Sequence, residues 1–177
     1  HYGEGDGNGK RILDPATEVT LGENSYMEME MVQIKGVDST KRTTTAELDK
    51  GAKLIIRERL LTHGSQYAES GFVVNLNGED SSANVISRAV AKDHSKQLFL
   101  AEINGNNKCA GHSECDAIIM DEANISAVPK ITANDVNAAL IHEAAIGKIA
   151  GEQLIKLMTL GLTEAEAEEQ IVNGFLK

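Results

Sequence analysis

Large aromatic side chains are scarce in this sequence of 177 residues, which has three Phe, three Tyr and no Trp. A sandwich or an ordinary α/β core normally relies on more of these side chains. A core built almost wholly from Val, Ile, Leu and Ala suits stacked, repetitive layers, in which small side chains pile on one another. The scarcity of aromatics therefore favours a layered β architecture.

Positive charge is also scarce. The 17 Lys and Arg are outnumbered by 27 Asp and Glu, which leaves a formal net charge of −10. This excess argues against duplex DNA or RNA as partners, because nucleic acids favour a basic face. No apolar run approaches the roughly 20 residues that span a bilayer, and the segment that begins at His1 lacks the basic and apolar stretches of a signal peptide. We therefore expect a cytoplasmic protein without a membrane span.

Several catalytic signatures are missing from the sequence. It contains no G-x-x-x-x-G-K-[ST], no G-x-S-x-G and no H-E-x-x-H, because Ala-Ala-Ile follows His142-Glu143. There are only two cysteines, Cys109 and Cys115. In an acidic chain without a signal peptide, these indicate a reducing compartment and favour a metal or catalytic role over a structural disulfide.

Short segments that alternate apolar and polar residues run through most of the chain, with turn clusters between them. Strand-like segments begin near residues 27, 53, 71, 84, 97 and 117. Turn clusters include residues 77–80 and 104–107. Many short strands without intervening helices predict an all-β fold. A sandwich and a β-helix both satisfy this pattern, and the shortage of aromatics favours the β-helix.

The hydrophobic period changes from two to 3.6 after about residue 141, which predicts helices. Thr163-x-x-Glu166 has the form of a capping box at the start of a second helix. We therefore expect a β domain over residues 1–140, with a flexible glycine-rich loop over residues 1–10. A helical hairpin is expected over residues 141–177. Its apolar stripe either caps the β core or docks a partner.

Cysteine and histidine are the side chains most suited to chemistry here. Cys109-x2-His112-x2-Cys115 has metal-like spacing, but in an extended strand the two cysteines share one face and His112 points away. Either cysteine could instead be a small buried hydrophobe. His142-Glu143 is expected at a strand-to-helix junction, where the pair either caps the helix or takes a functional role.

Several segments together resemble the carboxy-terminal part of the SufB/SufD family, the scaffold subunits of the SUF machinery for iron–sulfur cluster assembly. The resemblance covers most of the chain. It rests on the following segments: Leu21-Gly-Glu-Asn-Ser, Thr62-His-Gly, Ser113-Glu-Cys-Asp-Ala-Ile-Ile-Met, His142-Glu-Ala-Ala-Ile-Gly-Lys-Ile-Ala-Gly-Glu-Gln-Leu, Gly161-Leu-Thr-Glu-Ala-Glu-Ala and Ile171-Val-Asn-Gly-Phe.

This resemblance implies a right-handed parallel β-helix followed by a helical segment, residues 147–177, that docks an ABC-type ATPase. It also implies a dimer with a second copy or a family paralogue. The cluster-building Cys and Glu of the family fall on Cys115 and Glu143, with His142 beside the latter. These residues would hold a transient iron–sulfur cluster, and Cys109 and His112 are weaker candidate ligands.

Two departures from the family pattern stand out. The cysteine that precedes Gly-Glu-Asn-Ser in SufB-type proteins is replaced here by Thr20 and Leu21, and the usual amino-terminal region is missing. The chain is therefore expected to be a short SufB-like member or a fragment, and a scaffold protein rather than an enzyme. Alternatives are a structural SufD-like subunit without its own cluster, or a thiol enzyme with Cys115 as nucleophile and His112 or His142 as base.

Overall fold

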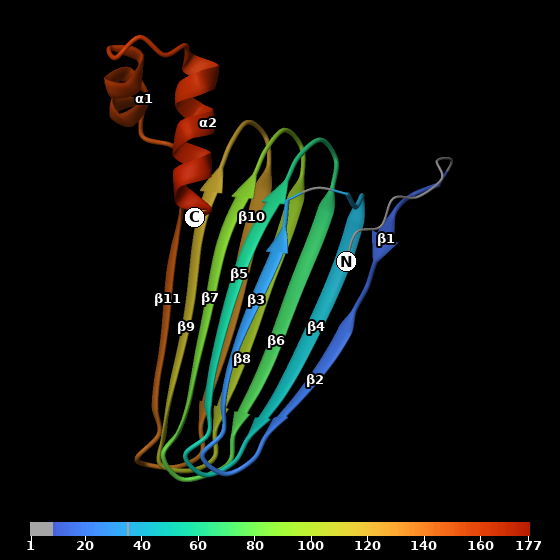
Figure 1. The fold of residues 1–177 in the computed structure, drawn as a ribbon, viewed down its shortest axis with the longest axis vertical. Coiled ribbons are helices and arrows are strands. Elements are labelled where there is room, and N and C mark those ends of the chain that lie inside the picture. The colour runs from blue at the N-terminus through green and yellow to red at the C-terminus, as the bar shows by residue number, and fades with distance from the viewer. Residues whose placement is uncertain (1–8, 35) are drawn as a thin grey trace.

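The computed structural model describes residues 9–34 and 36–177. Most of the predicted glycine-rich loop, residues 1–10, lies outside this range. The described chain is a β-solenoid of about five turns with two C-terminal helices (Figure 1). Its strands are β1 Ile12–Leu13, β2 Ala16–Leu21, β3 Tyr26–Gln33, β4 Ser39–Leu48, β5 Lys53–Thr62, β6 Tyr67–Leu76, β7 Ser81–Ala91, β8 Lys96–Gly105, β9 Cys109–Ile119, β10 Asn124–Ala133 and β11 Ala139–Gly147.

The strands form two parallel sheets that face each other. Sheet A has the order β1-β4-β6-β8-β10, with β2 also paired to β4, and sheet B has the order β11-β9-β7-β5-β3. The chain therefore crosses to the opposite sheet after nearly every strand, and each pairing joins strands one turn of the solenoid apart. This pairing confirms the predicted β-helix and excludes an antiparallel sandwich.

Alternation of side chains gives the solenoid its core. Along β5 every second residue is buried, and β7, which pairs with it, shows the same alternation over most of its length. The resulting core is mainly aliphatic, and its aromatic contact within the described residues is Phe72 against Phe99, with ring centroids 5.8 Å apart. Small and branched side chains stack in successive turns, as the scarcity of aromatics predicts.

The sequence pattern missed β4 because this strand is rich in threonine rather than in apolar residues. Its inward positions include Thr40 and Thr44, which are both buried. Threonine is β-branched and favours strands, but it weakens the apolar alternation on which the prediction relied. The predicted strand starts at residues 71, 84 and 117 also fall inside β6, β7 and β9 rather than at their ends.

The expected helical hairpin over residues 141–177 is wrong in its first part. Residues Ala139–Gly147 form β11, which pairs in parallel with β9 along its whole length. This sheet pairing overrides the 3.6-residue period of the local sequence. The helices are α1, Gly151–Met158, and α2, Glu164–Phe175. No helix within the described ranges is long and apolar enough to cross a membrane.

Helix α2 begins at the predicted capping box and packs on the solenoid. Thr163 Oγ1 accepts a hydrogen bond from the Glu166 amide at 3.3 Å, and Glu166 Oε2 accepts one from the Thr163 amide at 2.8 Å. Val172 and Leu176 then pack against Val90 and Met120 of the solenoid. Helix α1 has no buried residue, so the two helices have different roles in the fold.

Candidate functional site

Strands β9 and β11 carry all the candidate ligands and form the last two strands of sheet B. Their register places His142 beside Ser113 and Glu143 beside Glu114. Because strand side chains alternate, Cys109 and Cys115 point into the solenoid, whereas His112 points outward. This is the arrangement expected for an extended strand. Both cysteines are free thiols.

The inner face of sheet B holds Cys115 within a row of residues stacked on successive strands. Glu58, Ser87 and Cys115 lie in register on three successive strands. A cavity of about 10 Å³ is lined by all three and by Ser70 from sheet A. This volume is about that of one water molecule. Cys115 is therefore wholly buried in a small, partly polar chamber.

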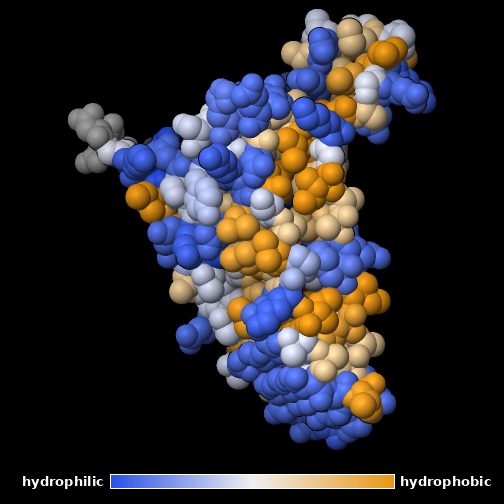
Figure 2. Space-filling model, turned by 180° about the vertical axis from the view of Figure 1, so that it is seen from behind, coloured by the Kyte–Doolittle hydropathy of each residue, from blue (hydrophilic) through white to orange (hydrophobic). Residues whose placement is uncertain are grey.

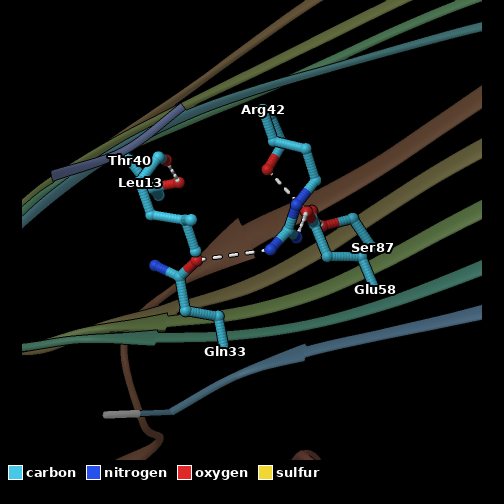
Figure 3. A network of polar contacts seen from close by, with 7 residues as sticks. Leu13, Gln33, Thr40, Arg42, Glu58 and Ser87 are labelled. Carbon is cyan, nitrogen blue, oxygen red and sulfur yellow. Dashed lines mark hydrogen bonds and ion pairs between the residues drawn. The ribbon is translucent and has the colours of Figure 1, made fainter. Parts of the chain in front are cut away.

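Glu58 is the charged group of this chamber and is only 2% exposed. Its carboxylate accepts hydrogen bonds from Ser70 Oγ at 2.5 Å, Ser87 Oγ at 2.9 Å and Arg42 Nη1 at 3.3 Å. Arg42 Nη2 also donates to Gln33 Oε1 at 3.4 Å (Figure 3). A buried carboxylate needs such partners, because an unpaired charge in the interior is strongly destabilising.

The same surroundings keep the Cys115 thiol protonated. Burial first, and then the negative charges of Glu58 and Asp116, raise the pKa of Cys115 to about 12. A catalytic cysteine needs the opposite, a lowered thiol pKa in an electropositive and partly exposed setting. The geometry thus argues against the thiol-enzyme alternative.

His142 lies on the inner face, in the middle of β11, and so it does not cap a helix. Its register partner is Ser113, two residues before Cys115. His142 Nδ1 and Ser113 Oγ are both buried and have no hydrogen-bond partner within the described part of the chain. Burial, and then the charge of His112, lower the pKa of His142, which favours the neutral imidazole. Two unpartnered polar atoms and one thiol therefore share the inner face of the last two strands of sheet B.

The outer face of the same strands gathers a different set of side chains. His112 Nε2 lies 3.3 Å from Glu143 Oε2, and His112 Nδ1 lies 3.0 Å from Asn84 Oδ1. One donor atom from each of His112, Glu114 and Glu143 can be chosen so that all lie within 4.8 Å of one another. Burial, and then the neighbouring Asp116, raise the pKa of Glu114.

The candidate residues thus fall into two groups and one outlier. Cys115 and His142 face inward, and His112 and Glu143 face outward. Cys109 is buried at the other end of β9, where burial raises its thiol pKa, and it does not approach Cys115 along the strand. Sequence reasoning missed Glu114, although the His112-x-Glu114 alternation was a usable signal. It also missed Glu58, which has no local signal because its partners lie on other turns.

Comparisons with known proteins point to one family. The family model described as SUF system FeS cluster assembly, SufBD core domain, matches residues 11–175. A relative from Methanothermobacter thermautotrophicus, named an iron-sulfur cluster assembly SufBD family protein, is 32% identical over 165 residues, which are 92% of this chain and 40% of the relative. A relative of the same name from Archaeoglobus fulgidus is 33% identical over 165 residues, which are 92% of this chain and 44% of the relative.

A further relative from Methanocaldococcus jannaschii, also named an iron-sulfur cluster assembly SufBD family protein, is 31% identical over 183 residues. The alignment covers 99% of this chain and 56% of that protein. The chain thus spans about half the length of the curated relatives it matches. With the family model covering nearly all of the solenoid and both helices, the chain belongs to the SufBD family of iron–sulfur cluster assembly proteins.

Proposed function

We propose that this chain is a cytoplasmic scaffold subunit on which a nascent iron–sulfur cluster is built or carried, and that Cys115 and His142 hold this cargo. Family membership supports the class of activity, an assembly protein rather than an enzyme. The observation that carries the cargo site is the pair of unpartnered atoms, Ser113 Oγ and His142 Nδ1, on the inner face that Cys115 shares. Buried polar atoms without partners are rare in proteins, and they suit a position that a bound group occupies.

The chemistry of these side chains suits cargo that is handed on. Thiolate is the natural ligand of iron–sulfur clusters, and imidazole replaces it at some cluster irons. Cys115 must lose its proton when it binds iron, so binding releases a proton and tightens as the pH rises. One thiolate per chain leaves the cluster incompletely held by cysteine, which favours transfer over storage. Glu143 points to the opposite face of β11, so it would bind iron only on the outside of the solenoid.

A second family subunit is proposed to cover the last turn of the solenoid. Within the described residues, β11 pairs only with β9 and β10 only with β8. An open strand edge offers unpaired backbone groups to another chain. Large apolar side chains are exposed on this last turn at Val128, Ile131, Val136, Ile141 and Ile146. Figure 2 shows apolar groups gathered on the side of the molecule that carries the helices. A second copy or a paralogue would bury them.

An ABC-type ATPase is proposed to dock on residues 147–177. Helix α2 is tied to the solenoid by its own apolar face, but α1 is not. Ile155, Met158 and Leu160 are exposed on and just after α1. Three large apolar side chains grouped in this way suit a helix that a partner protein covers.

Anaerobic reconstitution with iron and sulfide, with the ATPase present, tests the cargo role. We expect iron and acid-labile sulfide to bind the wild type, to be lost in Cys115→Ala and to fall in His142→Ala. Cys109→Ala is the matched control, since Cys109 is also a buried thiol of β9, and it should keep the cluster. A wild type that binds neither iron nor sulfide would refute the proposal.

The second candidate is a structural subunit without a cluster of its own. The complete burial of Cys115 and its raised pKa favour this alternative, because a protonated thiol inside a core is chemically inert. Cluster binding that survives loss of both cysteines would identify ligands elsewhere in the assembly and support the structural role.

A further inference from the structure

The outer face of sheet B carries an arrangement that the cargo site does not use. Glu114 and Glu143 are register partners on neighbouring strands, so their side chains emerge side by side from the same face. Like charges placed directly opposite each other in a sheet are destabilising. The nearest outward cation on the adjoining strand, Arg88, is in register with Asp116 rather than with this pair. The two carboxylates are therefore an acidic pair that a bound cation would stabilise.

His112 adds a nitrogen donor in a defined orientation. Its Nδ1 lies 3.0 Å from Asn84 Oδ1, an acceptor, so this nitrogen carries the hydrogen. The second ring nitrogen, Nε2, faces Glu143 Oε2, 3.3 Å away. A ring nitrogen and a carboxylate oxygen this close together share either a proton or a metal ion. Histidine ligands of metals commonly donate their other ring N–H to an oxygen acceptor in this way.

We propose that His112 Nε2, Glu114 and Glu143 form a binding site for a divalent first-row transition metal on the outer face, separate from Cys115, with Asn84 as the residue that orients His112. The donor atoms lie within 4.8 Å of one another, which a single ion can span. The two carboxylates match the charge of a divalent ion, and the mixed nitrogen and oxygen ligands suit ferrous iron, manganese or zinc.

The identity of the physiological ion as ferrous iron rests on the proposed function. Cys115 and Glu114 are neighbours on β9 but point to opposite faces. The outer site would therefore hold iron one strand thickness away from the thiol, with no thiolate ligand of its own. Iron held there by labile oxygen ligands can leave the outer site and move to Cys115 and His142.

Anaerobic titration of the metal-free chain with cobalt(II) tests the site, because cobalt reports its ligands by absorption. We expect one strong site per chain, with no sulfur-to-cobalt charge-transfer band. Each of His112→Ala, Glu114→Gln and Glu143→Gln should weaken binding at least roughly tenfold, and Asn84→Ala by roughly 10–100-fold. Cys115→Ala should bind cobalt as the wild type does. Circular dichroism and thermal unfolding check that every variant folds.

The matched control is His94→Ala. His94 Nδ1 lies 3.8 Å from Glu122 Oε2 on the exposed turns, so it forms a histidine–glutamate pair outside the proposed donor set. Unchanged affinity in this variant supports the proposal. Equal loss in His94→Ala, a thiolate band in the wild type, or loss of binding in Cys115→Ala would overturn it.

This test separates the two proposals. Cobalt binding that fails while cluster reconstitution succeeds overturns the outer site and leaves the scaffold role intact. Cobalt binding that succeeds while reconstitution fails supports the outer site as a metal site and overturns the cargo role of Cys115.

Discussion

The two faces of the β9–β11 pair differ in almost every physical property, although they are built from alternate residues of the same strands. The inner face places a buried thiol and a half-buried imidazole with a lowered pKa side by side. The outer face places a histidine and two carboxylates where solvent reaches them. The difference shows that alternate residues of one strand can form two chemically different sites, separated only by the thickness of the strand. Four predictions test how separate they are.

The largest effect is expected when the hydrogen-bonded network around Glu58, inside the solenoid, is broken. Glu58→Ala leaves the largely buried Arg42 side chain without its carboxylate partner, so the free energy of unfolding should fall by roughly 3–5 kcal/mol. Glu30→Ala is the outer-face control, because Glu30 forms an exposed ion pair with Arg59. It should cost less than about 1 kcal/mol. Urea unfolding measures both, and similar values for the two variants would contradict the contrast between the faces.

The next largest effect is a loss of stability at alkaline pH, which arises from the Cys115 thiol on the inner face. The folded pKa of Cys115 is about 12, above the usual value of 9.0, so the unfolded chain releases this proton first. The thiol's contribution is complete below pH 9 and is lost between pH 9 and 12, by up to roughly 1.4 kcal/mol per pH unit. Urea unfolding across this range should show a steeper fall for the wild type than for Cys115→Ala. Parallel curves would show that burial does not hold the thiol protonated.

A smaller effect of opposite sign is expected on the outer face. In the metal-free protein, Glu114→Gln removes one charge of the Glu114–Glu143 pair and should raise the free energy of unfolding by roughly 0.2–1 kcal/mol. Thermal unfolding in the presence of a chelator measures this change. A destabilised Glu114→Gln variant would mean that the two carboxylates do not repel each other in the folded chain.

The smallest effect concerns His142 on the inner face. Burial lowers the folded pKa of His142, so NMR titration of its ring in the metal-free chain should give a midpoint below the usual 6.5. Because the unfolded chain takes up this proton first, the contribution of His142 to stability is complete above pH 6.5 and is lost as the pH falls. Glu143→Gln serves as the outer-face control and should leave the midpoint of His142 little changed. A midpoint at or above 6.5 would contradict the half-buried position of the ring.

The sequence predicted the layered β fold and the family, but it could not predict how the candidate residues divide between faces. The aliphatic composition and the turn clusters indicated stacked strands, and Thr163 and Glu166 indicated the start of α2. The face of His142 depends on its pairing with Ser113, a residue one turn earlier. Local sequence around His142 indicated a helix, because its Ala-rich surroundings do not report a pairing so distant along the chain.

The open edge at β11 has a dynamic consequence. In a solenoid each coil contacts only its neighbours, so stability behaves as a one-dimensional array that frays from its ends. Strand β11 has a single strand partner among the described residues, and it is the strand that covers Cys115 on that side. Detachment of this one strand costs less than global unfolding. It would uncover the thiol and separate Glu143 from His112 in the same event, so both faces would open together.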